Sequence, residues 1–167
     1  MESRTLYTKI WEELSSHKSM VLLVGPRQAG KTTLANLISG NFSNHVYINW
    51  DIPDHRAELL KNPTFFTTLE RQDSSTPLVV LDEIHKYKEW KNYLKGIYDQ
   101  FCEQYRFLVS GNGRLDIYQK GGDSLAGRYF FFHLWPFTIA ELAGRNREIG
   151  SFLQDPLQLE MKDGSRL

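Results

Sequence analysis

The sequence predicts an α/β fold with a mainly parallel β-sheet. Five short apolar runs alternate with stretches of helical spacing, and the first run leads through a glycine-rich loop into a helix. The apolar runs lack polar alternation, which is typical of strands that are covered on both faces. Strands that alternate with helices favour a parallel sheet between two helical layers. At 167 residues, the chain has room for one such domain.

The first three elements are predicted to be a helix, a buried strand and a second helix. Residues 5–17 carry leucine and isoleucine at helical spacing, and the apolar run at 19–24 ends at a glycine. Beyond the glycine-rich loop, a helix is expected over 31–40, because its apolar side chains share one face. The helix is expected to stop at Gly40-Asn41, where a residue able to adopt a positive φ can end a helix.

Four more strands and one long helix complete the predicted domain. The strands correspond to residues 45–49, 77–82, 105–111 and 129–134. The helix is expected over 87–104, where apolar side chains from Trp90 to Phe101 recur at helical intervals. Because no linker composition interrupts these elements, we expect one domain over residues 1–150 and a polar tail over 151–167.

Charge and cysteine content limit the expected partners and compartment. Twenty basic and twenty acidic side chains cancel, so the net charge gives no support to nucleic-acid binding. No apolar run approaches the ~18 residues of a membrane span, so no membrane association is expected. The single cysteine, Cys102, cannot form an internal disulfide. These features predict a soluble cytoplasmic protein.

The glycine-rich loop has the spacing G-x-x-x-x-G-K-[ST] at Gly25, Gly30, Lys31 and Thr32. Its backbone N–H groups can surround a phosphate, because glycine permits the turn and the helix N-terminus adds partial positive charge. Lys31 is expected to reach the β- and γ-phosphates, and the Thr32 hydroxyl to bind Mg²⁺. The expected nucleotide-binding residues are Gly25, Arg27, Gln28, Ala29, Gly30, Lys31, Thr32 and Thr33.

Two adjacent carboxylates follow the third predicted strand. Asp82 ends the apolar run 77–82, at the edge where open α/β sheets bind ligands, and Glu83 comes next. Asp82 is expected to hold Mg²⁺ through its water shell. Glu83 can orient and deprotonate an attacking water, whereas a kinase needs its acceptor substrate in that place.

The letters DEIH at 82–85 also occur in one large class of helicases. A helicase motor needs a second, similar domain, for which this chain has no length. The strand 105–111 is followed by no serine-alanine-threonine element, so His85 is expected to be an ordinary side chain at the start of a loop. Because no asparagine-lysine-x-aspartate element for guanine occurs, ATP is the expected nucleotide.

Three further residues have open assignments. Either Ser110 or Asn112, at the end of the fourth strand, can hydrogen-bond the γ-phosphate or the water, and the sequence does not decide between them. Arg128, directly before the fifth strand, can act as an arginine finger on a neighbouring subunit. It can equally pair with Asp123 or cap a helix.

These motifs together carry a family resemblance over roughly residues 15–145. GPRQAGKTTL, LVVLDEIHKYKEW, SGN, SLAGRYF and LWPFTIAEL resemble the ATPase domain of AAA+ proteins in which an AAA_14 domain precedes a DUF4143 domain. The resemblance implies a three-layer P-loop NTPase sandwich of the AAA+ (ASCE) type, with strand order 5-1-4-3-2. It also implies Walker A roles for Lys31 and Thr32, Walker B roles for Asp82 and Glu83, and a finger role for Arg128.

The chain departs from this family pattern after residue 145. AAA+ proteins generally close the adenine pocket with a helical lid, and the remaining residues are too few for a lid or a C-terminal domain. We therefore expect weaker nucleotide binding than in a relative with a lid, and weak ATPase activity.

The leading functional hypothesis is an Mg²⁺-dependent ATPase that couples hydrolysis to conformational change or assembly. The alternative is a signalling or scaffold switch that binds ATP and hardly hydrolyses it. A kinase is disfavoured, because Glu83 follows Asp82 and no arginine-rich lid segment occurs. The sequence allows a homo-oligomer with Arg128 acting in trans, and it does not identify the protein client.

Overall fold

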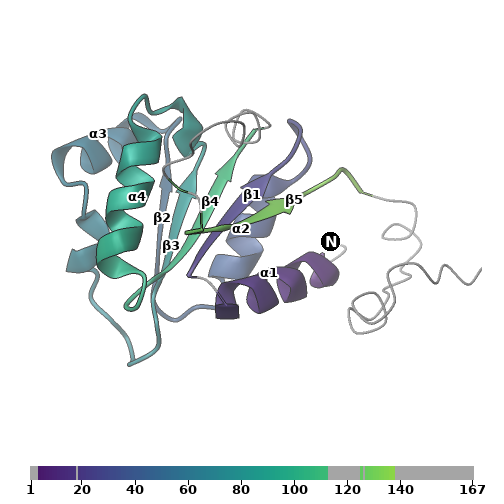
Figure 1. Cartoon of the computed structure of the whole chain (residues 1–167), viewed down its shortest axis with the longest axis horizontal. Coiled ribbons are helices and arrows are strands. Elements are labelled where there is room, and N and C mark those ends of the chain that lie inside the picture. Colours follow the sequence, from purple (N-terminus) through teal and green to yellow (C-terminus); the bar gives the residue numbers. More distant parts are fainter. Residues whose placement is uncertain (1–3, 18, 113–124, 126, 138–167) are drawn as a thin grey trace, which may run out of the picture.

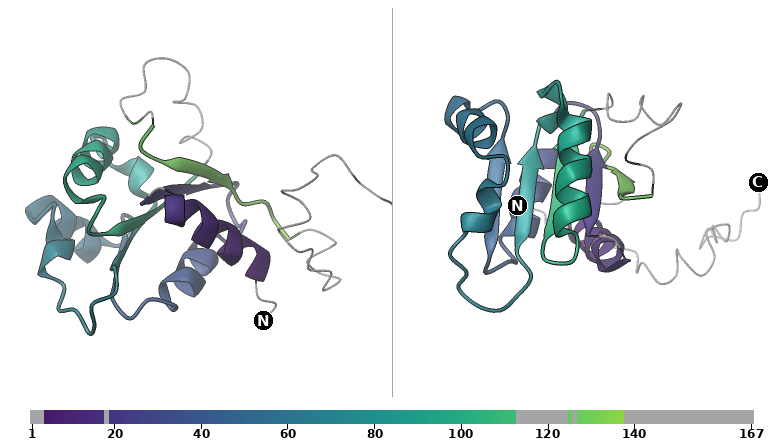
Figure 2. Two further views of the ribbon diagram at one scale, coloured as in Figure 1. Left: turned by 60° about the horizontal axis from the view of Figure 1, so that its bottom comes forward. Right: turned by 60° about the vertical axis from the view of Figure 1, so that its left-hand side comes forward.

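The computed structural model describes residues 4–17, 19–112, 125 and 127–137. Within these residues the chain forms one five-stranded sheet with helices on both sides (Figures 1 and 2). The expected domain end at residue 150 and the expected tail 151–167 lie outside the described residues. None of the helices in the described part is long and apolar enough to cross a membrane.

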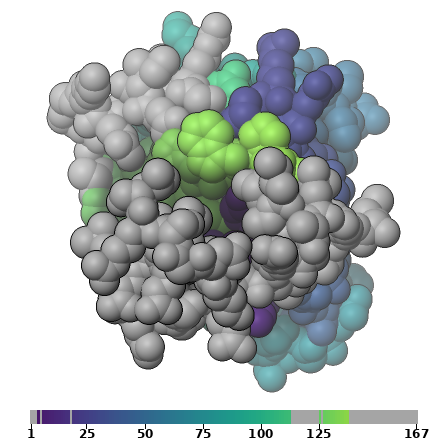
Figure 3. All heavy atoms as spheres, turned by 90° about the vertical axis from the view of Figure 1, so that its right-hand side faces the viewer, coloured from purple at the N-terminus to yellow at the C-terminus, as the bar shows by residue number. Residues whose placement is uncertain are grey.

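The strand order is β2-β3-β4-β1-β5, with every neighbouring pair parallel, which confirms the predicted order 5-1-4-3-2. The strands are β1 (Met20–Val24), β2 (His45–Asn49), β3 (Leu78–Asp82), β4 (Arg106–Gly111) and β5 (Phe130–His133). The expectation that both faces of each strand are covered is right for β1 and β3, whose residues are all buried, and nearly right for β4. It is wrong for β2 and β5, whose residues are mostly half-exposed or exposed, because an edge strand has a neighbour on one side only. Figure 3 shows the face on which β5 and the described residues that follow it reach the surface, in green.

Two helices cover one face of the sheet. They are α1 (Thr5–His17) and α2 (Lys31–Ser39). Trp11 from α1 and Leu34 from α2 pack with Leu23 and Leu108 of the sheet in one buried cluster. The helices therefore shield β1 and β4 from water on this face of the sheet.

The other face is covered by α4 (Trp90–Phe101) and by two elements that the sequence did not predict, α3 (Pro53–Lys61) and the 3₁₀ helix η1 (Phe65–Thr68). Leu94 of α4 and Phe66 of η1 share a second buried cluster with Leu22 and Phe107. These two clusters on opposite faces give the predicted three layers.

The end of α2 differs from the sequence expectation. Gly40 has φ −62° and lies in the right-handed helical region, so it does not end the helix through a positive φ. Its N–H still bonds the carbonyl of Asn36, and the next two N–H groups bond residues three positions back, at 3.1 and 3.0 Å. The helix therefore ends by tightening its last turn.

The parallel arrangement brings the carboxyl ends of β1, β3 and β4 to one edge of the sheet. The glycine-rich loop after Val24, the acidic pair after Leu81 and the polar residues from Ser110 onward all lie at this edge. Arg128 precedes β5, whose Phe130 pairs with Val21 near the start of β1, so it lies at the opposite edge.

Candidate functional site

The loop between β1 and α2 uses its two motif glycines for different reasons. Gly30 has φ +86°, a left-handed conformation that glycine adopts without steric cost. Gly25 has no such angle; a Cβ there would overlap the carbonyl oxygen of Leu134. Leu134 is held at this place by its N–H, which donates to the Val24 carbonyl at 2.7 Å. Gln28 also turns left-handed, with φ +62°, and completes the curvature of the loop.

The loop forms one wall of an open pocket of about 630 Å³. The lining residues from the loop and α2 are Arg27, Gln28, Gly30, Lys31, Thr32 and Thr33, and those from the other elements are Asn49, Asp51, Glu83, Lys86 and Asn112. Of the residues expected to bind nucleotide, Gly25 and Ala29 do not line the pocket. Ala29 is buried in the cluster beneath α2.

Lys31 folds back onto its own loop. Its Nζ donates to the carbonyl oxygens of Gly25 at 3.0 Å and Pro26 at 2.8 Å. Burial lowers the pKa of Lys31, and the charges of Glu83 and Asp82 only partly offset this effect. The lysine is thus a cation in a partly desolvated place, with weak carbonyl partners that a phosphate can replace.

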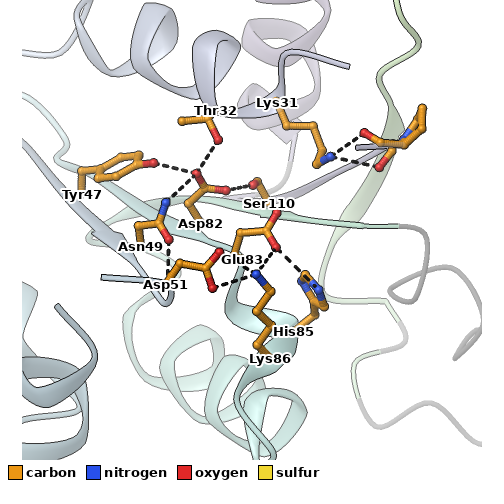
Figure 4. A network of polar contacts seen from close by, with 12 residues as sticks. Lys31, Thr32, Tyr47, Asn49, Asp51, Asp82, Glu83, His85, Lys86 and Ser110 are labelled. Atoms are coloured by element: carbon orange, nitrogen blue, oxygen red, sulfur yellow. Dashed lines mark hydrogen bonds and ion pairs between the residues drawn. The ribbon is translucent and has the colours of Figure 1, made fainter. Parts of the chain in front are cut away.

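Asp82 is almost completely buried and accepts hydrogen bonds from several elements (Figure 4). Oδ2 accepts from the Thr32 hydroxyl at 2.8 Å, the Tyr47 hydroxyl at 2.6 Å and the Asn49 amide at 3.4 Å. Oδ1 accepts from the Ser110 hydroxyl. Burial, and then the hydrogen bond to Asp82, raise the pKa of Tyr47, so this phenol stays a donor at all ordinary pH values.

Thr32 and Asp82 fit a magnesium ion in the manner of nucleotide sites. Mg²⁺ prefers oxygen ligands and is usually held by one or two carboxylates together with substrate phosphates and water. Here the Thr32 hydroxyl and the Asp82 carboxylate already lie 2.8 Å apart beside the glycine-rich loop. No group of three or more histidine, cysteine or acidic side chains suitable for a metal occurs in the described residues.

Glu83 has a left-handed backbone, with φ +56°, at the start of the short 3₁₀ helix η2 (Ile84–Lys86). Its Oε2 lies 3.0 Å from Lys86 Nζ and 3.7 Å from His85 Nε2. The His85 side chain is only 3% exposed, and the residue lies in η2 rather than at the start of a loop. Its aromatic ring is buried because η2 turns it inward beside Glu83.

Lys86 bridges two carboxylates. Its Nζ donates to both oxygens of Asp51, at 2.7 and 2.6 Å, and lies beside Glu83. Partial burial opposes the lysine's charge, but hydrogen bonds to Asp51 and Glu83 outweigh it and raise the pKa of Lys86. Lys86 is therefore a fixed positive charge at the pocket.

Ser110 and Asn112 have different surroundings. Ser110 is fully buried in β4, and its hydroxyl is committed to Asp82. Asn112 follows the end of β4 and lines the pocket. The structure thus brings Asn112, and not Ser110, to the place where a ligand can be contacted directly.

Arg128 forms an ion pair with Asp99 at the end of α4. Its Nε lies 2.6 Å from Asp99 Oδ1, and this hydrogen bond from Arg128 lowers the pKa of Asp99. The sequence suggested Asp123 as the partner, and Asp123 lies outside the described residues. Arg128 does not join the pocket of its own chain, because β1, of five residues at ~3.3 Å each, separates the two edges by roughly 15 Å.

Four polar residues of the site escaped the sequence reading: Tyr47, Asn49, Asp51 and Lys86. Tyr47 and Asn49 lie on β2, whose pairing with β3 sets Asn49 beside Asp82. The change from apolar to polar side chains at the end of this strand is the signal that could have marked Asn49 and Asp51. Nothing in the sequence distinguishes Lys86 from the neighbouring Lys88.

Comparison with known proteins finds a matching family and two curated relatives. A model of the family AAA_14, described as an AAA domain, matches residues 17–143. The uncharacterized protein Rv2008c of Mycobacterium tuberculosis and the uncharacterized protein Mb2031c of Mycobacterium bovis are each 29% identical over 140 residues. These alignments cover 84% of this chain but only 29% of each relative, so the chain spans less than a third of their length.

One solved structure shows the same fold. The Walker-type ATPase PABY2304 of Pyrococcus abyssi matches with a TM-score of 0.57 and 15% identity, over 84% of this chain and 55% of that chain. At this identity the likeness concerns the arrangement of strands and helices.

Proposed function

The chain belongs to the AAA_14 family and is an AAA-type P-loop ATPase domain, and from this premise we propose that it binds Mg²⁺-ATP beside Lys31 and hydrolyses it. The observation that carries the proposal is that Lys31, Thr32 and Glu83 line one pocket at the edge of the sheet, where Thr32 also donates a hydrogen bond to Asp82. Each of these residues is of the type that the corresponding step requires.

In this proposal the residues act in sequence on the nucleotide. The loop N–H groups and Lys31 bind and orient the phosphates, and Lys31 exchanges its two carbonyl partners for phosphate oxygens. Thr32 and Asp82 would hold Mg²⁺, which supplies positive charge to the phosphate oxygens when bound. Glu83 orients a water and accepts its proton as the water attacks the γ-phosphorus. The bond between the γ-phosphorus and the oxygen that bridges it to the β-phosphate breaks, so ADP leaves and inorganic phosphate is formed. The energy of this cycle would drive a conformational change or assembly.

Replacement of Glu83 by glutamine tests this assignment. Glu83→Gln keeps the size of the side chain and removes its basicity, so turnover is expected to fall by about 10²–10⁴. The affinity for ATP, measured by calorimetry, is expected to stay near that of the original chain.

Two outcomes would contradict the ATPase proposal. Unchanged phosphate release in Glu83→Gln would exclude the base role. Phosphate release at background level in the original chain, together with an ATP-dependent change in oligomeric state or protease sensitivity, would favour the switch function instead.

Asn112 is proposed as the residue that contacts the γ-phosphate or the water, and Ser110 as a support for Asp82. Asn112→Ala is expected to lower kcat while the melting temperature is kept. Ser110→Ala is expected to lower the stability of the nucleotide-free chain by about 1–3 kcal/mol, because a buried carboxylate oxygen loses its donor. Thermal melts and steady-state kinetics on both variants separate the roles, and the reversed pattern would refute this division.

Arg128 is proposed to complete the site of another copy of the chain. The pocket of the same chain lies at the opposite edge of the sheet from Arg128, which supports action on another copy over action on the same chain. Specific activity is then expected to rise with protein concentration, and Arg128→Ala is expected to abolish the rise. Fingers of this kind contribute up to about 10³–10⁵ in rate.

Asp99→Ala is the matched control for this experiment, because it removes the same ion pair and leaves the guanidinium. Asp99→Ala should retain the concentration dependence. Equal loss in both variants would mean that the ion pair matters for structure and that Arg128 is no finger.

A further inference from the structure

The molecule carries a second group of charges at the pocket that the proposed hydrolysis does not use. It consists of Asp51, after the end of β2, and Lys86, in η2, and Lys86 also contacts Glu83. Both Asp51 and Lys86 line the same pocket as Lys31. Figure 4 shows the Lys86 side chain reaching between the carboxylates of Asp51 and Glu83.

The distances indicate which partner anchors Lys86. Nζ contacts both oxygens of Asp51, at 2.7 and 2.6 Å, but only one oxygen of Glu83, at 3.0 Å. Charge-assisted contacts of this length are the strong ones among hydrogen bonds. Asp51 therefore holds the ammonium, and the held ammonium in turn fixes Glu83 Oε2.

Asp51 is itself tied to the buried carboxylate. Its backbone N–H donates to Asn49 Oδ1 at 2.8 Å, and the amide of Asn49 donates to Asp82 Oδ2 at 3.4 Å. A continuous path of contacts thus runs from Asp82 through Asn49, Asp51 and Lys86 to Glu83. Because Asp82 and Glu83 are also adjacent in sequence, the path closes a ring that fixes the Glu83 carboxylate relative to the Asp82 carboxylate.

The two oxygens of Glu83 are in different situations. Oε2 lies beside Lys86 and 3.7 Å from the buried ring of His85. Oε1 accepts no hydrogen bond from any residue in the described part of the chain. One oxygen is fixed by positive or polar nitrogen atoms, and the other is left for a water molecule. The left-handed backbone of Glu83, which costs about 1–3 kcal/mol in a non-glycine residue, needs such surrounding contacts to persist.

We propose that Lys86 is a positioning residue for Glu83, anchored by Asp51, and that it holds the carboxylate so that Oε1 meets the attacking water. This inference rests on the proposed ATPase function. An ammonium also weakens a neighbouring base, but both side chains are partly exposed, at 37% and 22%, so solvent screens that effect. Misplacement of a reacting group costs up to about 10²-fold in rate, so positioning outweighs the weakened basicity.

Steady-state kinetics and ATP calorimetry on Lys86→Met test the proposal. We expect kcat to fall by roughly 10- to 100-fold, with the dissociation constant for ATP and the melting temperature unchanged. Lys86→Arg, which keeps the charge, should recover much of kcat. Asp51→Asn, which leaves the backbone N–H in place, should also lower kcat, but by a smaller factor than Lys86→Met.

Lys88→Met is the matched control, because Lys88 is exposed two residues further on and makes no ion pair within the described residues. It should behave as the original chain. If Lys86→Met melts at a lower temperature, the kcat values of Lys86→Arg, which keeps the charge, and Asp51→Asn, which keeps the shape, decide the question. A higher kcat in Lys86→Arg than in Asp51→Asn supports the positioning role, and the reverse order overturns it.

The outcomes separate this inference from the proposed function. If Glu83→Gln is inactive and Lys86→Met keeps or raises kcat, the positioning role is overturned and the ATPase function stands. A weaker ATP affinity at unchanged kcat would make Lys86 a phosphate contact and would also overturn it. If the original chain turns over no faster than Glu83→Gln, the proposed function fails, and this inference fails with it.

Discussion

A carboxylate buried at the edge of a parallel sheet must be matched by donors, and Asp82 is the residue on which this structure depends. An unpartnered buried charge costs several kcal/mol, whereas one that accepts hydrogen bonds can be kept. Asp82 obtains its donors from Thr32 at the start of α2, from Tyr47 and Asn49 on β2, and from Ser110 on β4. The Asp82 side chain thereby joins the start of α2 to β2 and β4, the two strands that flank β3.

The two adjacent carboxylates are held differently, and this difference suits them to different tasks. Asp82 is buried and surrounded by neutral donors, which keep its side chain in place. Glu83 is partly exposed and lies beside Lys86 and His85, so one of its oxygens is fixed and the other faces no protein donor among the described residues. Neighbouring acidic groups in separate environments are a common way in which enzymes divide roles. The ring of contacts through Asn49 and Asp51 keeps the two carboxylates in a fixed relation.

Much of the fold follows from the sequence because its strands and its longest helix have strong patterns. The order of the strands was an implication of the family resemblance, whereas the meeting of Thr32 with Asp82 follows because a parallel sheet brings the carboxyl ends of its strands to one edge. The helix α3 was missed because only Leu59 of its residues is buried, so no apolar stripe marks it. Ser110 and Asn112 could not be separated, because their roles depend on where β4 ends. Lys86 has no local pattern, since its partner Asp51 is 35 positions away in the sequence and meets it only through the pairing of β2 with β3.

The central claim is that Thr32 and Asp82 form a magnesium site shared with ATP. Calorimetric titration of ATP into the chain with Mg²⁺, and again with excess EDTA, tests it most directly, and Asp82→Asn is measured in parallel. We expect clearly tighter ATP binding with Mg²⁺ in the original chain and loss of that difference in Asp82→Asn. Equal affinity with and without Mg²⁺ in the original chain would contradict it.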